Sequence, residues 1–251
     1  MSLRDRIATP DGKGRYVRVL FATIADRYDF ITRALSYGQD QRWKRRLVDL
    51  AAPRPGARAL DLATGTGDIA FALAARGARV VGLDITFRMI ELARNRQTGG
   101  ARGFRPGGGR APEKLALRFL VGDMHAIPFP AGSFDIVTTG YGLRNVPDLT
   151  MAIDEIARVL TPRGQVLSLD FNRPSNRVVR SAYLAYLTVV GAALGWILHR
   201  DPDTYRYIPA SIRLYPGADA VTRLFEARGF SGVRSHPVLG GLMAIHHAIR
   251  A

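Results

Sequence analysis

The sequence predicts an α/β fold with a mostly parallel β-sheet, and three features of the chain support this prediction. From residue 58 onward, short apolar runs alternate with stretches of helical periodicity, which is the pattern of βαβ units. A glycine-rich turn follows the first apolar run, where such folds bind nucleotide-like ligands. The C-terminal stretch, 231–250, contains two strand-like runs about a Gly-Gly turn, which predicts a closing antiparallel hairpin.

The predicted elements follow in a regular order. A strand over 58–63 leads into a helix over 68–77 that Gly77 closes, and a second strand over 78–85 leads into a helix over 87–96. The next expected elements are two strands, a helix and a fifth strand, at 117–123, 134–140, 149–160 and 165–171. Helical spacing in the third helix predicts a buried face formed by Met151, Ile153, Ile156, Val159 and Leu160.

The length of 251 residues suits one domain, residues 1–251, and three of its segments lie outside the repeating pattern. Residues 1–50 are expected to form a helical cap over the sheet. Residues 97–114 are rich in Gly, Pro and Arg, which predicts a disordered surface insertion. Residues 175–215 are expected to form a helical insertion that faces the substrate or its lipid tail.

Composition restricts the classes of function. The chain has no cysteine and its five histidines lack metal-site spacing, so we expect neither disulfides nor a metal. The first residues lack the apolar core of a signal peptide, which predicts a cytoplasmic protein. The net charge of +15 favours an anionic partner, either nucleic acid or a lipid surface. A genome biased towards arginine explains the charge equally well, because lysine occurs only at Lys13, Lys44 and Lys114.

The glycine turn contains Gly65, Thr66 and Gly67, and Ala70 replaces the third glycine of a dinucleotide-binding loop. This spacing alone does not exclude NAD. Two nearby carboxylates, Asp61 and Asp68, would repel a pyrophosphate but attract a ligand that carries an ammonium and a sulfonium. The sequence therefore favours S-adenosylmethionine, although an N-cap role also explains Asp68.

Two more acidic residues end the following strands. Asp84 lies 23 residues after Asp61, the spacing at which a carboxylate accepts hydrogen bonds from a ribose diol. Asp123 ends the third strand, where it is expected to accept from an adenine amino group while Met124 covers the ring. Because parallel strands end at one edge of a sheet, these side chains are predicted to surround one nucleoside.

Three further motifs resemble the S-adenosylmethionine-dependent C-methyltransferases of menaquinone and ubiquinone biosynthesis, from about residue 28 to the C-terminus. They are YDFITRALSYGQDQRW at 28–43, YGLRNVPD at 141–148 and RVLTPRGQVLSLDF at 158–171. The resemblance implies a Rossmann-like class I methyltransferase with a seven-stranded sheet and helices on both faces. The cofactor-binding residues it implies, with those above, are Asp61, Gly65, Thr66, Gly67, Asp84, Ile85, Asp123, Met124 and Gly140.

Several positions depart from the family pattern. Gly140 stands where some members have a cofactor-contacting Ser, which leaves a side-chain contact there in doubt. Thr32 stands where the family usually has Asn, and Asp40 where it has His. Arg163 stands where the family usually has Gly, and Asp170 where it has Glu.

Methyl transfer from a sulfonium is an in-line displacement, so the protein mainly aligns the reactants and excludes water. For a polyprenyl quinol acceptor, as the resemblance implies, Arg144 and Asn145 are expected to stabilise the phenolate oxygen. The alternative for Arg144 is an ion pair with Asp148 or Asp170. The catalytic set also includes Tyr28 and Asp29, on an N-terminal helix that closes over the cofactor, and Tyr141 is expected to line the substrate pocket. For His246, a hydrogen-bonded strand position is favoured over acid/base chemistry.

Residues 181–198 carry no charge and approach the length of a membrane span. A span would separate the fifth strand from the hairpin of the same sheet, so we predict instead a helix buried on one face. It is expected to offer Tyr183, Tyr186 and Trp196 to the isoprenoid tail or to an anionic membrane at its inner face. An ordinary helix that covers the core is the alternative.

Other functions stay open from the sequence. Within enzymes, the acceptor is demethylmenaquinol, a benzoquinol precursor of ubiquinone, or another small molecule or lipid. The basic charge alone suggests an RNA methyltransferase or nucleic-acid binder, which would need stacking platforms or a recognition domain that are not evident, so no nucleic-acid partner is expected. A non-catalytic membrane module would have no use for the cofactor set. A homodimer is neither favoured nor excluded.

Overall fold

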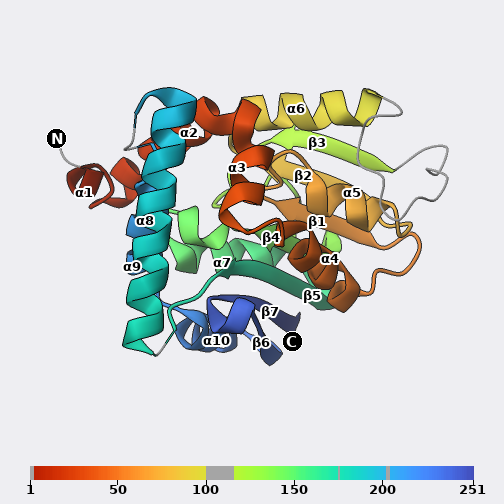
Figure 1. The fold of residues 1–251 in the computed structure, drawn as a ribbon. Coiled ribbons are helices and arrows are strands. Elements are labelled where there is room, and N and C mark those ends of the chain that lie inside the picture. The colour runs from red at the N-terminus through yellow and green to blue at the C-terminus, as the bar shows by residue number, and fades with distance from the viewer. Residues whose placement is uncertain (1–2, 100–115, 175, 202–203) are drawn as a thin grey trace.

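A seven-stranded sheet forms the centre of the computed structural model, which describes residues 3–99, 116–174, 176–201 and 204–251. The strand order is β3-β2-β1-β4-β5-β7-β6, in which β7 runs antiparallel to both β5 and β6 and the other pairs are parallel (Figure 1). The predicted α/β fold with its antiparallel hairpin is therefore confirmed. The strands are β1 (Arg58–Leu62), β2 (Arg79–Asp84), β3 (Leu117–Val121), β4 (Phe134–Gly140), β5 (Leu160–Phe171), β6 (Phe230–Val238) and β7 (Met243–Arg250).

Helices cover both faces of the sheet, and the central strands are therefore buried on both sides. Along β1, Ala59 packs into one core and Leu60 into the other. The first core is completed by α4 (Asp40–Ala51), α5 (Asp68–Ala74) and α6 (Phe87–Thr98), and the second by α7 (Leu149–Val159) and α10 (Ala218–Ala227).

Asp148 is the N-cap of helix α7, and its side chain accepts hydrogen bonds from the backbone N–H groups of Thr150 and Met151. Its buried residues are Ala152, Ile153, Ile156 and Val159. The prediction for Met151 was wrong, because this residue is 52% exposed. Leu160 is buried as predicted, but as the first residue of β5, which starts five residues earlier than predicted.

The chain order creates a switch point between β1 and β4. From β1 the chain moves outward through β2 and β3, then returns to the other side of β1 as β4. Ligands of open α/β sheets bind at the carboxyl ends of the strands beside such a point. The chain begins with the helices α1 (Leu3–Arg6), α2 (Pro10–Ile24), η1 (Ala25–Arg27) and α3 (Tyr28–Leu35), of which α2 and α3 contribute side chains to this region.

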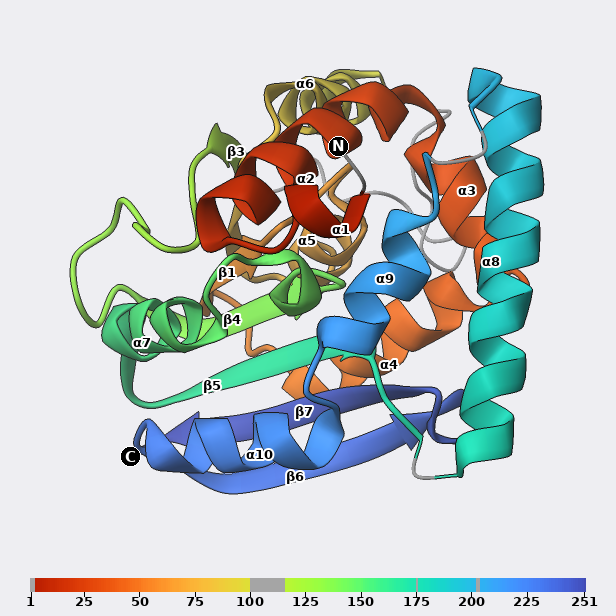
Figure 2. The ribbon, with the colours of Figure 1, turned by 90° about the vertical axis from the view of Figure 1, so that its left-hand side faces the viewer.

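The long helix α8 (Arg177–His199) runs along one side of the molecule in both views (Figure 1 and Figure 2). Its buried positions, Tyr183, Leu187, Gly191 and Gly195, recur every four residues and so form one stripe. The stripe packs near α3 and α9 (Tyr207–Leu214). Among the described residues, α8 is the helix whose length and composition would allow a membrane span, and 17% of its most apolar window is buried.

The predicted insertion begins later than expected, because α6 continues through Gln97 and ends at Thr98. The rest of that prediction falls largely on residues 100–115, which lie outside the described residues.

Candidate active site

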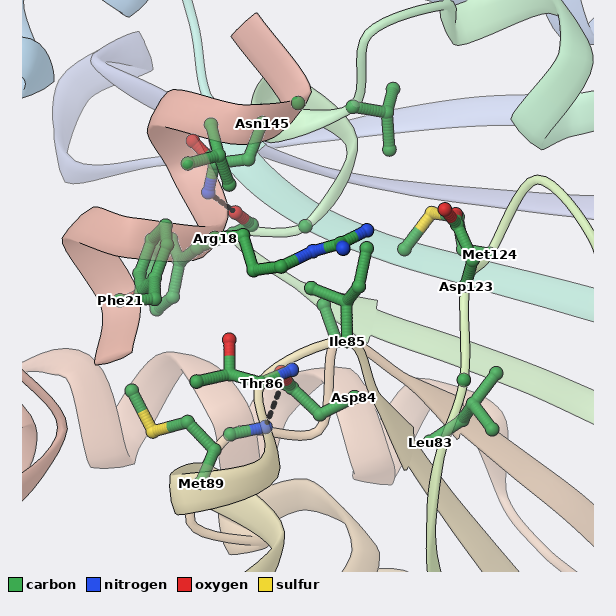
Figure 3. A pocket seen from close by; sticks show the side chains of 18 of the residues that line it. Arg18, Phe21, Leu83, Asp84, Ile85, Thr86, Met89, Asp123, Met124 and Asn145 are labelled. Atoms are coloured by element: carbon green, nitrogen blue, oxygen red, sulfur yellow. Dashed lines mark hydrogen bonds between the residues drawn. The ribbon is translucent and has the colours of Figure 1, made fainter. Parts of the chain in front are cut away.

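A pocket opens at the carboxyl ends of the first four strands (Figure 3). We call it the strand-end pocket. Helix α2 contributes Val17, Arg18 and Phe21 to its wall. The sequence-predicted residues that line it are Tyr28, Gly65, Asp84, Ile85, Asp123, Met124, Gly140, Tyr141 and Asn145.

Asp84 connects the glycine turn to the end of β2. One carboxylate oxygen accepts from the Gly65 N–H at 2.9 Å, and the other accepts from the Thr86 N–H at 2.8 Å. Burial raises the pKa of this carboxyl group above its usual value, although these hydrogen bonds oppose the shift. A carboxylate oxygen has more than one acceptor position, so Asp84 keeps capacity for a ligand hydroxyl.

The opposite part of the pocket is formed by Asp123 and Met124, which follow β3 (Figure 3). The Asp123 carboxylate accepts from the His125 N–H at 2.9 Å, and the contact with His125 lowers the pKa of Asp123. Its side chain remains 43% exposed and so is open to a ligand. At Gly140 a Cβ would lie 2.8 Å from Ile69 Cδ1, so a side chain there would require Ile69 to move.

The other predicted acidic contacts do not line the pocket. Asp61 is buried beneath the turn, where it accepts from the Thr64 hydroxyl at 2.6 Å and the Thr138 hydroxyl at 2.7 Å. Burial raises the pKa of Asp61 to about 7. Asp68 instead forms ion pairs with Lys44 at 2.8 Å and Arg96 at 2.9 Å. Burial opposes the shift, but these two cations lower the pKa of Asp68.

Only two of the four predicted acidic residues line the strand-end pocket. The charge of Asp68 is compensated inside the protein, and Asp61 supports the turn from below, so neither presents a carboxylate to the strand-end pocket. Asp84 and Asp123 do so. Gly67 has a φ of +91° and a Cβ there would lie 2.8 Å from Phe119, so this glycine shapes the turn.

Thr66 and Asp29 bind each other outside the pocket. The Thr66 hydroxyl donates to Asp29 at 2.6 Å, and Arg96 donates to the Thr66 carbonyl at 2.9 Å. Asp29 is about half exposed and lines neither of the two pockets described here. It therefore ties α3 to the glycine turn, whereas its neighbour Tyr28 faces inward.

A second, mostly apolar pocket adjoins the first, and Phe21, Tyr28 and Tyr141 line both. We call it the apolar pocket. Its wall comes from helices α2, α3, α4, α8 and α9, from strands β5 and β7, and from loops that include the segment before α9. The remaining lining residues are Leu20, Ile24, Ile31, Thr32, Leu35, Ser36, Trp43, Arg144, Phe171, Tyr183, Thr204, Tyr205, Tyr207, Ile208 and Met243.

Arg144 brings the only guanidinium among the described lining residues into this apolar wall. The side chain is 5% exposed and lies over the Phe171 ring, 4.8 Å from its centroid. Its Nη1 donates to the Ser211 hydroxyl, its Nε lies 3.5 Å from Asp170, and its backbone N–H donates to Asp170 at 2.9 Å. The pairing with Asp170 is thus present together with the pocket position, whereas Asp148 caps α7.

Asn145, although adjacent in sequence, faces the other pocket. Its Nδ2 donates to the Tyr141 carbonyl at 2.7 Å, and its buried Oδ1 has no hydrogen-bond partner among the described residues. Tyr141 itself has a φ of +61°, a strained conformation for a residue with a side chain, and its buried hydroxyl is also without a partner in the described part of the chain. Both groups therefore keep hydrogen-bonding capacity that the described residues do not use.

Lys44 was not predicted from the sequence. Its ammonium lies 5.9 Å from the Tyr141 ring centroid and pairs with Asp40 at 3.1 Å as well as with Asp68. These carboxylates raise the pKa of Lys44 in spite of its burial. The unusual Asp40 is therefore part of a buried charge cluster. The sequence feature that could have indicated a role for Lys44 is its position directly after Trp43, in a chain with few lysines.

The three aromatic residues predicted along α8 lie in different environments. Tyr183 is buried and lines the apolar pocket. Tyr186 stacks on Tyr37, with ring centroids 5.0 Å apart, and Trp196 is 64% exposed near the other end of the helix. His246 is buried in β7, where its Nε2 donates to the Ala218 carbonyl at 3.0 Å, as expected for a hydrogen-bonded strand histidine.

The sheet order, with its antiparallel β7, and the strand-end pocket at the switch point are those of the Rossmann-like fold of class I methyltransferases. Solved structures share this fold. A SAM-dependent methyltransferase from Thermotoga maritima aligns with a TM-score of 0.62 at 16% identity, over 94% of this chain and 100% of that one. Another from Aquifex aeolicus aligns with a TM-score of 0.55 at 14% identity, over 83% and 89%.

The chain belongs to the ubiE/COQ5 methyltransferase family, whose model matches residues 10–250. It is 41% identical to a demethylmenaquinone methyltransferase of Thermus thermophilus, over 90% of this chain and 98% of the relative. It is 33% identical to a ubiquinone/menaquinone biosynthesis C-methyltransferase of Teredinibacter turnerae, over 95% and 93%. These matches confirm the family that the sequence motifs predicted. They also confirm that the protein is a methyltransferase.

Proposed function

We propose that this protein transfers a methyl group from S-adenosylmethionine to a ring carbon of a polyprenyl quinol, with demethylmenaquinol as the acceptor. The observation that carries the proposal is the pair of adjoining pockets. One offers carboxylates at strand ends, and the other is mostly apolar and contains the buried guanidinium of Arg144. They share the wall formed by Phe21, Tyr28 and Tyr141. The names of the relatives support the same reaction.

The strand-end pocket suits S-adenosylmethionine. Asp84 has acceptor capacity for the ribose hydroxyls, and Asp123 for the adenine amino group, with Ile85 and Met124 as apolar surfaces for the ring. The unpartnered Oδ1 of Asn145 is an acceptor that favours a cationic ligand over a phosphate. When bound, S-adenosylmethionine supplies an electrophilic methyl group on a sulfonium.

The apolar pocket supplies what the acceptor needs. A quinol ring carbon becomes nucleophilic as the neighbouring hydroxyl loses its proton, so negative charge develops on that oxygen. Arg144 is held by Asp170 and Ser211 and stacked on Phe171, and so forms a fixed donor for this charge. The guanidinium has N–H donors and no acceptor, so it stabilises the developing charge and does not act as the base. The shared aromatic wall excludes water from the reacting atoms.

The direct test compares methyl transfer to demethylmenaquinol and to the benzoquinol precursor of ubiquinone, using purified protein and labelled S-adenosylmethionine. We expect the larger kcat/KM with the naphthoquinol. A larger kcat/KM with the benzoquinol would show that the benzoquinol is the acceptor and demethylmenaquinol is not. Transfer to neither quinol would overturn the proposed substrate class.

We also propose that the protein works at the inner face of the cytoplasmic membrane, where a polyprenyl acceptor resides. Val178, Val189, Trp196 and Ile197 on the outer side of α8 are between 64% and 77% exposed. Arginines flank this apolar strip at both ends of the helix, at Arg177, Arg180 and Arg200. Apolar surface bordered by cations favours an interfacial helix on anionic lipid. The apolar pocket lies on the buried side of the same helix, where Tyr183 lines it.

A further inference from the structure

Helix α2 forms part of the wall of both pockets. Val17 and Arg18 face the strand-end pocket, Leu20 and Ile24 face the apolar pocket, and Phe21 faces both. The helix begins at Pro10 after an N-cap by Thr9, whose hydroxyl accepts from the Gly12 N–H. The position of its first turn therefore decides how completely both pockets are enclosed.

One side chain of that first turn reaches the loop that carries Arg144. The ammonium of Lys13 donates to the carbonyl of Arg144 at 3.0 Å and to the carbonyl of Val146 at 2.6 Å. These two carbonyls lie on either side of Asn145. Hydrogen bonds from an ammonium are stronger than neutral ones, so a single side chain fixes the backbone around both predicted catalytic residues.

Close packing accompanies this contact. The Cα of Gly14 lies so near the loop that a Cβ there would be 3.2 Å from Pro147 Cγ. A larger residue at this position would push the helix away from the loop. The first turn of α2 and the segment 144–147 are thus matched in both shape and hydrogen bonding.

The surroundings of Lys13 make its proton easier to lose. Burial and, to a smaller extent, the neighbouring Arg144 lower the pKa of Lys13 to about 8, although Asp170 opposes them. A neutral amine would donate more weakly to the two carbonyls, so the contact is expected to loosen at alkaline pH.

We propose that Lys13 is a positioning residue, which closes α2 over both pockets and fixes the loop that holds Arg144 and Asn145. The proposal rests on the proposed function for its kinetic consequence, but its structural consequence is independent of the acceptor. Lys13 touches neither pocket, so it acts through the helix and the loop.

The test uses Lys13→Met and Lys13→Arg, with Arg15→Met, an exposed residue of the same helix, as the matched control. At pH 7 we expect kcat/KM to fall about tenfold in Lys13→Met, to recover largely in Lys13→Arg, and to change less than about twofold in the control. Above pH 8 the activity of the wild type and of Arg15→Met should fall, whereas Lys13→Arg should keep its rate because arginine stays charged.

An acceptor-independent measurement accompanies the kinetics. Hydrogen exchange of the α2 amides at saturating S-adenosylmethionine should be faster in Lys13→Met than in wild type. If no quinol is methylated even by wild type, the proposed function fails while this measurement still tests Lys13. Exchange and kcat/KM equal to wild type in Lys13→Met, or an alkaline fall of Lys13→Arg identical to that of wild type, would overturn the proposal.

Discussion

At the scale of single residues, the structure gives Arg144 a fixed place in an apolar wall. Substitution by Ala should lower kcat by about 10²- to 10³-fold, the usual effect of removing an oxyanion donor. The affinity for S-adenosylmethionine should change little, because Arg144 lines the apolar pocket and not the strand-end pocket. Single-turnover rates and calorimetric titration measure the two quantities separately.

Removal of Arg144 also leaves Asp170 buried and unpaired, so the folding of the variant must be checked by thermal denaturation. Arg144→Lys keeps the charge near Asp170 but lacks the planar fork, and should still lose most of the rate. Arg228→Ala, which affects only a partly exposed ion pair with Asp154, is the control. Equal losses of cofactor affinity and turnover would contradict the assigned role of Arg144.

The buried carboxyl of Asp61 predicts a dependence of stability on pH. Its pKa is about 7 in the folded protein and about 4 in the unfolded chain. Between these values the folded state retains a proton that the unfolded state has released, so the contribution of Asp61 to stability decreases as pH rises through this window. The full loss, on the order of 4 kcal/mol, is present above pH 7.

Asp61→Asn removes this titration while it keeps the size of the side chain. Free energies of unfolding from denaturant titration between pH 4 and 8 should fall less steeply in the variant than in the wild type. The difference between the two proteins isolates Asp61, because Asp84 and Asp170 have raised pKa values in both. Parallel curves over this range would show that Asp61 is ionised in the folded state.

At the scale of elements, one departure from the family pattern lies at a left-handed backbone position within β5. Arg163 has a φ of +62° and is exposed, in a position where the family usually has glycine. A side chain in the left-handed region costs about 1 kcal/mol, whereas glycine adopts it freely. The departure therefore places strain in an early part of the strand.

Arg163→Gly should raise the melting temperature by about 1 to 2 °C, because relief of this strain exceeds the added entropy of the unfolded chain by roughly 0.5 kcal/mol. Arg163→Ala keeps a Cβ and should give no such increase. Differential scanning calorimetry distinguishes the two variants, and equal melting temperatures for Gly and Ala would remove strain as the explanation.

At the scale of the whole molecule, the charge of +15 and the outer side of α8 predict binding to anionic vesicles. Co-sedimentation should be stronger with phosphatidylglycerol-containing vesicles than with phosphatidylcholine alone, and should weaken with salt. The double variant Trp196→Ser, Ile197→Ser should reduce binding about tenfold, because both apolar side chains leave the interface.

Met151→Ser removes a similarly exposed apolar residue from α7 and serves as the control. Binding that is unchanged in the double variant, or equal for both kinds of vesicle, would exclude α8 as the contact. Retention on RNA with a steep loss in salt would instead favour the nucleic-acid alternative left open by the composition.

Features that depend on interactions between residues close in the chain could be predicted from the sequence, and features that depend on distant residues could not. Elements were predictable because periodicity and glycine positions act over a few residues, and the family was recognisable from three short motifs. Five residues of the strand-end pocket could be predicted to lie together, because parallel strands place their ends on a common edge. They are Asp84, Ile85, Asp123, Met124 and Gly140. Boundaries such as the start of β5 at Leu160 were less accurate, since pairing with neighbouring strands sets them.

The sequence by itself determined the order of elements, the sheet edge that carries the strand-end pocket and the family. Only the tertiary structure decided that Arg144 and Asn145 face different pockets, that Asp68 is paired with Lys44, and that Lys13 reaches the loop 133 residues further along the chain. The physical reason is that periodicity fixes which face of an element is buried. The direction of a loop side chain and the partner of a buried charge depend on packing between segments far apart in the chain.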